Sequence, residues 1–320
     1  MNNTIDPQEL KLYYSFPGYD RFDFPEGIYR VTAGMGGESL LISGEKYVAL
    51  YDTGMAYPHQ ALIGNIRRVL AKLGRDRVDI LLLSHTHYDH IGALPYLLKE
   101  WPEAVVVAAD KARSVFASEG ARRTMKRLGE VARDSFSDSS EPVITDGLRV
   151  DWTVGDGSRI DIGGRWLDVL ETGGHTDCSL TYVLQPDSIM FLSESTGIMR
   201  GQDEVRTTVL KSFPDSIESA RKCKEYHPER IIVPHYGIVP EFYTQKYFDV
   251  YLRELRGEIN LVCGLAQQGM NEEQILEQVE QIYWFKGREY YQTKEAFRLN
   301  TGISIRLILK TYGKDGIPTE

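Results

Sequence analysis

Short apolar runs separated by turn residues occupy the first 110 positions of the chain and predict a series of strands. Three of them, "GIYRVTA" (27–33), "ESLLIS" (38–43) and "YVALYD" (47–52), are rich in β-branched or aromatic residues and are divided by glycine-rich turns. Two later runs, "VDILLL" (78–83) and "AVVVAA" (104–109), are almost wholly apolar. Such runs are typical of strands that are covered on both faces.

Helical spacing of apolar residues appears between these runs. Residues 58–73 show it clearly, and further helices are predicted at about 91–100, 111–134 and 214–226. Strand patterns return from about 148 to 192 and once more in "RIIVP" (230–234). This alternation predicts an α/β body.

The last quarter of the chain has a mostly helical pattern. Helices are predicted at roughly 241–268, 271–284 and 293–311, and Asn271 followed by two glutamates is typical of a helix start. We therefore expect two parts: an α/β domain over residues 1–240, with a helical insertion at about 111–135, and a helical C-terminal extension over residues 241–320.

Composition excludes several classes of protein. The chain is 42% hydrophobic and 26% charged, and no apolar run approaches the length of a membrane span. The start, "MNNTIDPQEL", lacks the basic and apolar regions of a signal peptide, and three widely spaced cysteines argue against a disulfide framework. A cytoplasmic protein is the expectation. The net charge of −9 argues against nucleic acid as the partner.

The segment "LLLSHTHYDHIGALP" (81–95) concentrates the candidate chemistry. His85 and His87 are two residues apart on an extended segment, so their side chains point the same way and can bind one metal ion. Asp89 and His90 follow at a bend, where they can face a neighbouring position. A histidine-rich surface loop would be the alternative.

"HTHYDH" resembles the HxHxDH signature of the metallo-β-lactamase superfamily. Other segments resemble that family in the same order along the chain: "VALYDTG" (48–54), "ETGGHTDCSL" (171–180), "SIMFLSEST" (188–196) and "RIIVPHYG" (230–237). The resemblance implies an αββα sandwich with one or two metal ions at one edge of its two sheets. Together with the helical tail, the expected fold is this sandwich with a C-terminal helical cap.

The resemblance also implies a ligand set of seven residues. His85, His87 and His175 would bind one metal ion. The second ion would be bound by Asp89, His90 and His235, and Glu194 would bridge the two ions.

Three further features of these segments concern Asp52, Glu194 and Cys178. Asp52 would accept a hydrogen bond from a ligating imidazole and fix its tautomer, with a turn-forming aspartate as the alternative. Glu194 stands where the family usually has aspartate, at the end of a predicted strand. Cys178 stands where glycine is common and lies three residues after His175. A small buried thiol is the expected role, and a thiol close to the metal is the alternative.

Two divalent ions are the expected cofactors, zinc first, with iron or manganese as alternatives, because the ligands are imidazoles and carboxylates without a thiolate. The implied chemistry is attack by metal-bound hydroxide on a thioester or carboxylic ester, including an acyl-CoA, with Asp89 and Glu194 as the catalytic residues. A phosphodiesterase or a lactonase would use the same site. A di-iron protein that binds or senses oxygen is a further alternative, and a non-enzymatic docking protein is the last.

Two features bear on the substrate, which is expected to be a small molecule rather than a nucleic acid or a membrane. A basic segment within 111–133 is either a solvated helix face or a wall of the cleft that favours an anionic substrate. The helical tail is rich in aromatic residues, which would form a helical core, a homodimer interface or an apolar pocket. These aromatic residues are Tyr243, Tyr247, Phe248, Tyr251, Tyr283, Trp284, Phe285, Tyr290 and Tyr291.

Overall fold

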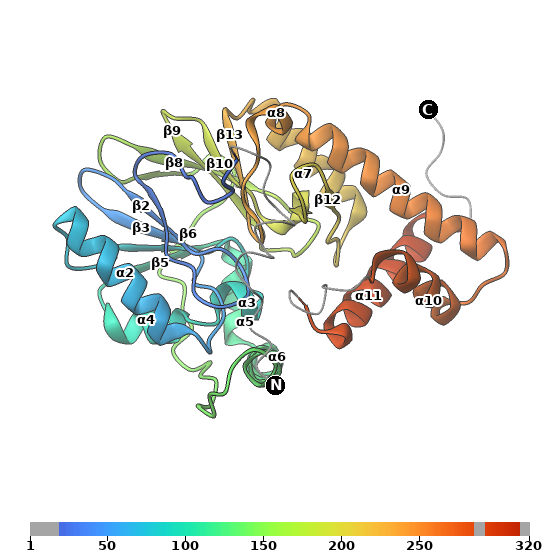
Figure 1. Cartoon of the computed structure of the whole chain (residues 1–320), viewed down its shortest axis with the longest axis horizontal. Coiled ribbons are helices and arrows are strands. Elements are labelled where there is room, and N and C mark those ends of the chain that lie inside the picture. Colours follow the sequence, from blue (N-terminus) through green and yellow to red (C-terminus); the bar gives the residue numbers. More distant parts are fainter. Residues whose placement is uncertain (1–18, 285–291, 314–320) are drawn as a thin grey trace.

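Two six-stranded sheets packed face to face form the body of the molecule (Figure 1). The computed structural model describes residues 19–284 and 292–313. Helices cover the outer face of each sheet, which gives the expected αββα arrangement. The predicted α/β fold class is confirmed.

The first sheet is built from the N-terminal strands in sequence order. Its strands are β1 (Ile28–Arg30), β2 (Leu40–Ser43), β3 (Val48–Tyr51), β4 (Ile80–Leu82), β5 (Val105–Ala108) and β6 (Trp152–Thr153). The first three strands pair antiparallel, and the pairs from β3 to β6 are parallel. Parallel neighbours bring the ends of β3 and β4 to the same edge of the sheet.

The second sheet has the order β14-β13-β10-β9-β8-β7, and a separate hairpin lies beside it. Its strands are β7 (Arg159–Asp161), β8 (Trp166–Glu171), β9 (Leu180–Gln185), β10 (Ile189–Phe191), β13 (Arg230–Val233) and β14 (Gly237–Ile238), and the hairpin strands are β11 (Ile198–Met199) and β12 (Val205–Arg206). Strands β7, β10, β11, β12 and β14 have no more than three residues, which is too short for a recognisable alternation of apolar and polar positions.

Buried aromatic residues join the two sheets. The Tyr51 hydroxyl donates a hydrogen bond to the Leu192 carbonyl at 2.7 Å, and the Tyr182 hydroxyl donates one to the Leu83 carbonyl at 2.9 Å. The ring of Tyr51 also packs edge-on against Tyr182 and lies 5.4 Å from the ring of Phe191. These contacts fix the two sheets against each other at the edge where the predicted ligands lie.

The helices of the first half differ in detail from the prediction. They are α2 (His59–Leu73), α3 (Tyr88–Ile91), α4 (Leu94–Glu100), α5 (Asp110–Ala117) and α6 (Glu119–Phe136). The helix expected at about 91–100 is α4, which begins at Leu94, and the separate short helix α3 precedes it and contains His90. The helix expected over 111–134 is interrupted at Ser118, whose side chain accepts a hydrogen bond from the Ala121 backbone and caps α6.

The helices of the second half lie on the outer face of the second sheet and continue away from it (Figure 1). They are the 3₁₀ turn η1 (Glu194–Thr196), α7 (Phe213–Glu225), α8 (Glu241–Thr244), α9 (Tyr247–Gln267), α10 (Glu272–Tyr283) and α11 (Lys294–Tyr312). Asn271 starts α10 with a capping box that includes Gln274, as its sequence context predicts. The helix expected at 241–268 is divided between α8 and α9.

Apolar contacts run across the domain boundary predicted near residue 240. Tyr247, Tyr251 and Leu255 of α9 belong to one hydrophobic core with Met190 of β10 and Phe213 of α7. Three of the predicted tail aromatics, Phe285, Tyr290 and Tyr291, lie outside the described residues. Among the described helices, none is both long and apolar enough to cross a membrane.

Candidate metal centre

The Asp52 carboxylate contacts Ser84 and His90 at the edge of the sheet where β3 and β4 end. Its carboxylate accepts hydrogen bonds from the Ser84 backbone N–H at 2.7 Å and from the Ser84 hydroxyl at 2.6 Å. The same carboxylate lies 2.7 Å from His90 Nδ1, and both side chains are fully buried. A buried carboxylate in this position assigns the proton to Nδ1 and leaves His90 Nε2 with a free lone pair.

Three imidazoles form the first ligand group. The ligand atoms of His85, His87 and His175 lie within 4.8 Å of one another. His85 Nδ1 lies 3.0 Å from the Ser84 hydroxyl, and among the described residues its buried Nε2 has no hydrogen-bond partner. Because an unsatisfied buried polar atom costs about 1–3 kcal/mol, this nitrogen is arranged to bind something else.

The orientation of His175 is set by main-chain and side-chain contacts. Its Nδ1 donates a hydrogen bond to the Thr208 carbonyl, and its backbone N–H donates one to the Ser195 hydroxyl at 3.0 Å. This leaves Nε2 as the lone-pair nitrogen, which lies 2.9 Å from His87 Nδ1. A histidine that donates one N–H to a carbonyl while the other nitrogen faces a shared centre has the arrangement of a metal ligand.

The second ligand group contains Asp89, His90, Glu194 and His235, whose ligand atoms also lie within 4.8 Å of one another. His235 Nδ1 lies 3.1 Å from the Gly36 carbonyl, which assigns its proton there and leaves Nε2 with a lone pair. His90 Nε2 and His235 Nε2 are 3.2 Å apart, and Glu194 Oε1 lies 3.0 Å and 2.8 Å from them.

These distances test whether the two groups fit metal ions. Two nitrogen lone pairs and a carboxylate oxygen converge in the second group, and such atoms repel one another unless a cation or a further proton lies between them. The first group offers three imidazoles, including the unpartnered nitrogen of His85. The residues therefore fit a pair of metal ions with nitrogen and oxygen ligands, a donor set that zinc, iron and manganese accept.

Glu194 lies between the two groups. One carboxylate oxygen contacts the second group, and the other, Oε2, lies 3.6 Å from His175 Nε2 of the first group. Its position differs from the prediction, because β10 ends at Phe191 and Glu194 starts the 3₁₀ turn η1. This turn begins three residues after the strand and presents the longer glutamate side chain to both groups.

Burial and neighbouring charges shift the pKa values of these side chains in different directions. Burial and the adjacent imidazoles lower the pKa of His85, and they lower that of His87 to about 3. Burial also opposes charge on His90 and His235, but nearby carboxylates outweigh it and raise their pKa values. Burial would raise the pKa of Glu194, yet the surrounding histidines hold it well below its usual range. Without a cation, His85 and His87 are therefore neutral and offer lone pairs.

A cavity of about 520 Å³ opens above the two groups. Its floor includes Asp89, Glu194 and His235, while its walls come from α6, α10, α11 and the hairpin segment 198–210. The volume lies within the usual range of about 300–1,000 Å³ for sites that bind small molecules. The helical tail therefore takes part in enclosing the site.

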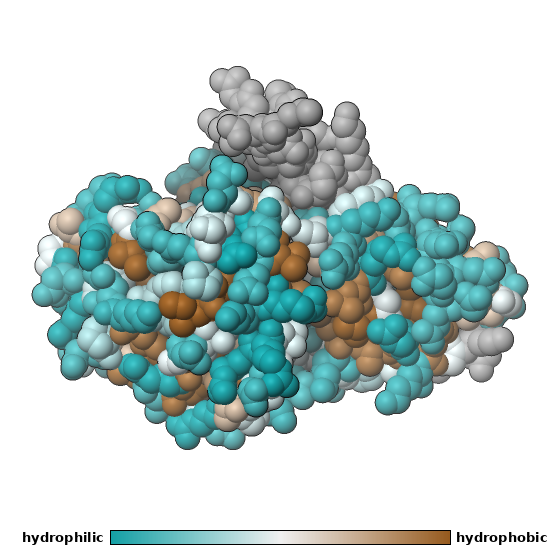
Figure 2. All heavy atoms as spheres, turned by 90° about the horizontal axis from the view of Figure 1, so that it is seen from below, coloured by the Kyte–Doolittle hydropathy of each residue, from teal (hydrophilic) through white to brown (hydrophobic). Residues whose placement is uncertain are grey.

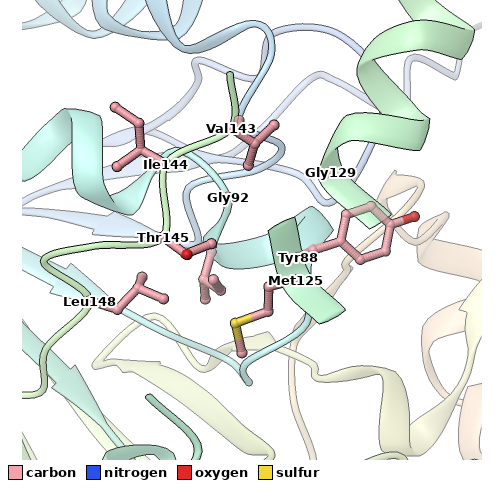
Figure 3. Close-up of a pocket in the computed structure, with 10 residues that line it drawn as sticks. Tyr88, Gly92, Met125, Gly129, Val143, Ile144, Thr145 and Leu148 are labelled. Carbon is pink, nitrogen blue, oxygen red and sulfur yellow. The ribbon is translucent and has the colours of Figure 1, made fainter. Parts of the chain in front are cut away.

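Helix α6 is anchored beside the ligand-bearing helix α3. Figure 3 shows Met125 of α6 pointing into a small space that Tyr88 and Leu148 also line, with Gly129 of the same helix close to Val143. A Cβ atom on Gly129 would lie 3.1 Å from Val143 Cγ1, so the glycine permits a close approach. This packing holds α6 as one wall of the cavity.

Two alternatives left open by the sequence can now be decided. The basic side chains of 111–133 are absent from the described lining of the cavity, where α6 instead contributes Leu128, Val131, Ala132 and Phe136. Cys178 is buried, and its sulfur lies 3.4 Å from the Thr86 and Thr176 hydroxyls. It belongs to neither ligand group of the described residues.

Apart from Asp52, sequence reasoning missed the groups that orient the histidines. Ser84 precedes "HTHYDH" directly, and its place between an apolar strand and the first histidine was the available signal. The carbonyls of Thr208 and Gly36 carry no side-chain signal at all, because any residue supplies a carbonyl.

Comparison with known families agrees with this geometry. The model of the metallo-beta-lactamase superfamily matches residues 33–235, well over half of the chain and a range that includes all seven predicted ligand residues. The chain belongs to the metallo-β-lactamase superfamily.

Relatives within the superfamily are named for different activities. The coenzyme F420H2 oxidase of Methanothermobacter marburgensis is 26% identical over 158 residues, which is 49% of this chain and 33% of that protein. The hydroxyacylglutathione hydrolase of a Synechococcus species is 33% identical over 107 residues, or 33% of this chain and 30% of that protein. The chain thus spans about a third of each of these two relatives.

Two solved structures of the superfamily show the same fold. A metallo-beta-lactamase superfamily protein from Sulfolobus tokodaii aligns with a TM-score of 0.56 at 19% identity, covering 90% of this chain and 100% of that one. A family protein from Thermus thermophilus aligns with a TM-score of 0.61 at 18% identity, covering 88% and 94%. At these identities the likeness concerns the fold alone.

Proposed function

We propose that this protein is a dinuclear metal-dependent hydrolase that cleaves a carboxylic ester or thioester. The observation that carries the proposal is Glu194, which faces two convergent ligand groups at once. Two ions bound there would lower the pKa of a shared water and polarise the substrate carbonyl. The superfamily relationship supports a hydrolase, and one relative has the name of a hydrolase of an acyl compound.

The ligand residues and the residues that orient them would have separate roles. His85, His87 and His175 would hold one ion, while Asp89, His90 and His235 would hold the other. Asp52 keeps the Nδ1 proton of His90 in place, and the Thr208 carbonyl does the same for His175. Asp89 lines the cavity, so its carboxylate can also accept a hydrogen bond from water beside the substrate.

A redox function is the second candidate, because a coenzyme F420H2 oxidase is among the relatives. The alignment covers only 33% of that protein, and the whole activity of the oxidase is therefore not carried over by the match. Bound iron with an oxygen-sensitive spectrum would favour this candidate over hydrolysis.

The decisive experiment measures metal content and hydrolysis on the same preparation of the full chain. Metal would be counted by plasma mass spectrometry, and turnover would be followed on acyl thioesters, carboxylic esters, lactones and nitrophenyl phosphodiesters. We expect two ions per chain and turnover of esters or thioesters that a chelator abolishes and added zinc, manganese or iron restores. Turnover of phosphodiesters alone, or the absence of metal after all three additions, would contradict the proposal.

A further inference from the structure

Two walls of the cavity come from helices outside the sheets. The α6 wall is apolar, whereas the α11 wall combines apolar side chains with polar ones such as Asn300, Thr301 and Ser304. Helix α6 contributes Leu128, Val131 and Phe136, and helix α11 contributes Phe297, Leu299 and Ile303. Figure 2, seen from below Figure 1, shows hydrophobic residues gathered between the sheet-containing body on the left and the C-terminal helices on the right. Apolar side chains that face a cavity next to a polar centre favour a ligand with an apolar part.

The two walls lie close to each other across the cavity. Arg127 of α6 and Glu295 of α11 approach to 3.8 Å, although both are exposed and their attraction is weak. The space between the walls is continuous with the floor that holds Asp89 and Glu194. A molecule whose reacting group lies on the floor would therefore extend between α6 and α11.

The charges of the described cavity lining balance. Outside the two ligand groups, the lining contains four arginines and four glutamates and no lysine. Arg30 pairs with Glu38 at 2.7 Å, and Arg206 pairs with Glu204 at 2.6 Å while lying over the Tyr283 ring. A lining with no net positive charge provides little attraction for a polyanion such as a nucleic acid.

We propose that the substrate carries an uncharged apolar acyl chain that lies between α6 and α11, with its ester or thioester carbonyl at the ligand groups. This inference rests on the proposed hydrolase function. In the reaction, the acyl carbon forms a bond to the oxygen of water and its bond to the leaving oxygen or sulfur breaks. The leaving alcohol or thiol takes one proton of the water, and the product acid releases the other.

Chain length tests the proposal directly. Burying one methylene changes binding by about fourfold, so kcat/KM is expected to rise about fourfold per added methylene until the space between the helices is filled. The substrates would be straight-chain acyl esters and thioesters from acetyl to dodecanoyl with a constant leaving group. A value of kcat/KM that is flat or falls from the acetyl member onward would overturn the proposal.

Substitutions at Ile303 should move the chain length of greatest kcat/KM in opposite directions. Ile303→Trp fills the space and should shift the maximum to shorter chains, whereas Ile303→Ala enlarges it and should shift the maximum to longer chains. Arg306→Trp is the matched control, because Arg306 is exposed on the same helix and is not part of the described lining. Equal profiles for both Ile303 variants and the control would contradict an acyl site at α11.

A binding measurement separates this inference from the hydrolase proposal. N-methyl amides of the same acids resist cleavage, and calorimetric titration gives their affinity for the full chain. Affinity that rises about fourfold per methylene would support the acyl site even if no ester is turned over. Turnover of short esters with no chain-length dependence in affinity would retain the hydrolase and remove the acyl site.

Discussion

Glu194 is the residue on which the dinuclear proposal depends most. Its two oxygens face different ligand groups, so the substitution Glu194→Gln removes the negative charge that would serve both ions. We expect the variant to lose about one metal ion per chain and to lose hydrolytic turnover by roughly 100-fold or more, because even residues that only orient ligands account for about 10–100-fold. Plasma mass spectrometry and ester hydrolysis would measure the two effects.

Glu204→Gln provides the control for this substitution. Glu204 is more exposed than Glu194 and pairs with Arg206, so removing the Glu204 charge should leave the metal content unchanged. Circular dichroism would establish that both variants remain folded. Two ions per chain in the Glu194 variant would rule out the bridging role.

Gly37 shows how closely the backbone approaches the site. A Cβ atom at this position would lie 2.7 Å from His90 Cε1 and Nδ1, a distance that real Cβ atoms do not adopt. Gly37→Ala should therefore push the His90 ring away from Asp52 and weaken metal binding by about 10–100-fold, as measured by competition with a chelator. Gly64→Ala is the matched control, because nothing lies within 4 Å of its added carbon.

The control substitution Gly64→Ala should increase the free energy of unfolding. Gly64 lies inside α2, where alanine stabilises a helix by about 0.5–1 kcal/mol relative to glycine. Thermal unfolding would report this gain together with unchanged metal affinity. Equal metal affinity for the Gly37 and Gly64 variants would show that the close approach does not position His90.

At the scale of elements, Glu258 connects three segments around the cavity. It lies in α9, accepts a hydrogen bond from Ser304 of α11 at 2.8 Å, and accepts another from the Thr207 hydroxyl. The neighbouring Thr208 carbonyl orients His175, and the Thr208 hydroxyl donates to the Glu194 carbonyl at 2.6 Å. The position of α11 is thus linked to the ligand groups through a short polar path.

The burial of the Glu258 carboxyl should make the free energy of unfolding depend on pH. Burial raises the pKa of its carboxyl above the usual value, so the folded state favours the neutral form. At pH values below the pKa of the Glu258 carboxyl in the unfolded chain, the carboxyl is neutral in both states and does not destabilise the folded state. The destabilisation grows as the pH rises through the folded-state pKa. Glu258→Gln, which stays neutral, should match the native chain at low pH and become relatively more stable as pH increases.

Denaturant unfolding at a series of pH values would measure this difference. Glu254→Gln is the control on the same helix, since Glu254 accepts no comparable pair of buried hydroxyls among the described contacts. A difference between the Glu258 variant and the native chain that does not change with pH would contradict the pKa argument.

How far the sequence predicts these elements depends on the range of the interactions that form them. The strand before His85 and the start of α10 at Asn271 follow from local patterns and were predicted closely. The separate helix α3 was not predicted. It lies in a region of non-local contact, where a Cβ on Gly92 would lie 2.5 Å from the Ala56 backbone nitrogen. The Glu258 contacts join residues 46 and 51 positions apart, a separation at which no local pattern signals a contact.

At the scale of the whole molecule, the helical tail is joined to the body by buried hydrogen bonds. The Tyr247 hydroxyl donates a hydrogen bond to the Thr196 carbonyl at 3.2 Å, and the Tyr251 hydroxyl donates one to the Ser195 carbonyl at 2.9 Å. Both tyrosines are fully buried against the second sheet and α7. Ser195 also accepts the backbone hydrogen bond of His175, so α9 supports the turn that carries Glu194.

A chain cut at residue 240 tests how independent the two predicted parts are. Removing 241–320 exposes the apolar face that α9 covers, so the shortened chain should lose native tertiary structure and bind fewer than two metal ions. The full chain should unfold in one calorimetric transition, because the core crosses the predicted boundary. A chain ending at Gly313 keeps every described residue and should behave like the full chain. If residues 1–240 alone retained native near-ultraviolet circular dichroism and two ions, the tail would be a separate cap and the path through Glu258 would be unnecessary for assembling the metal centre.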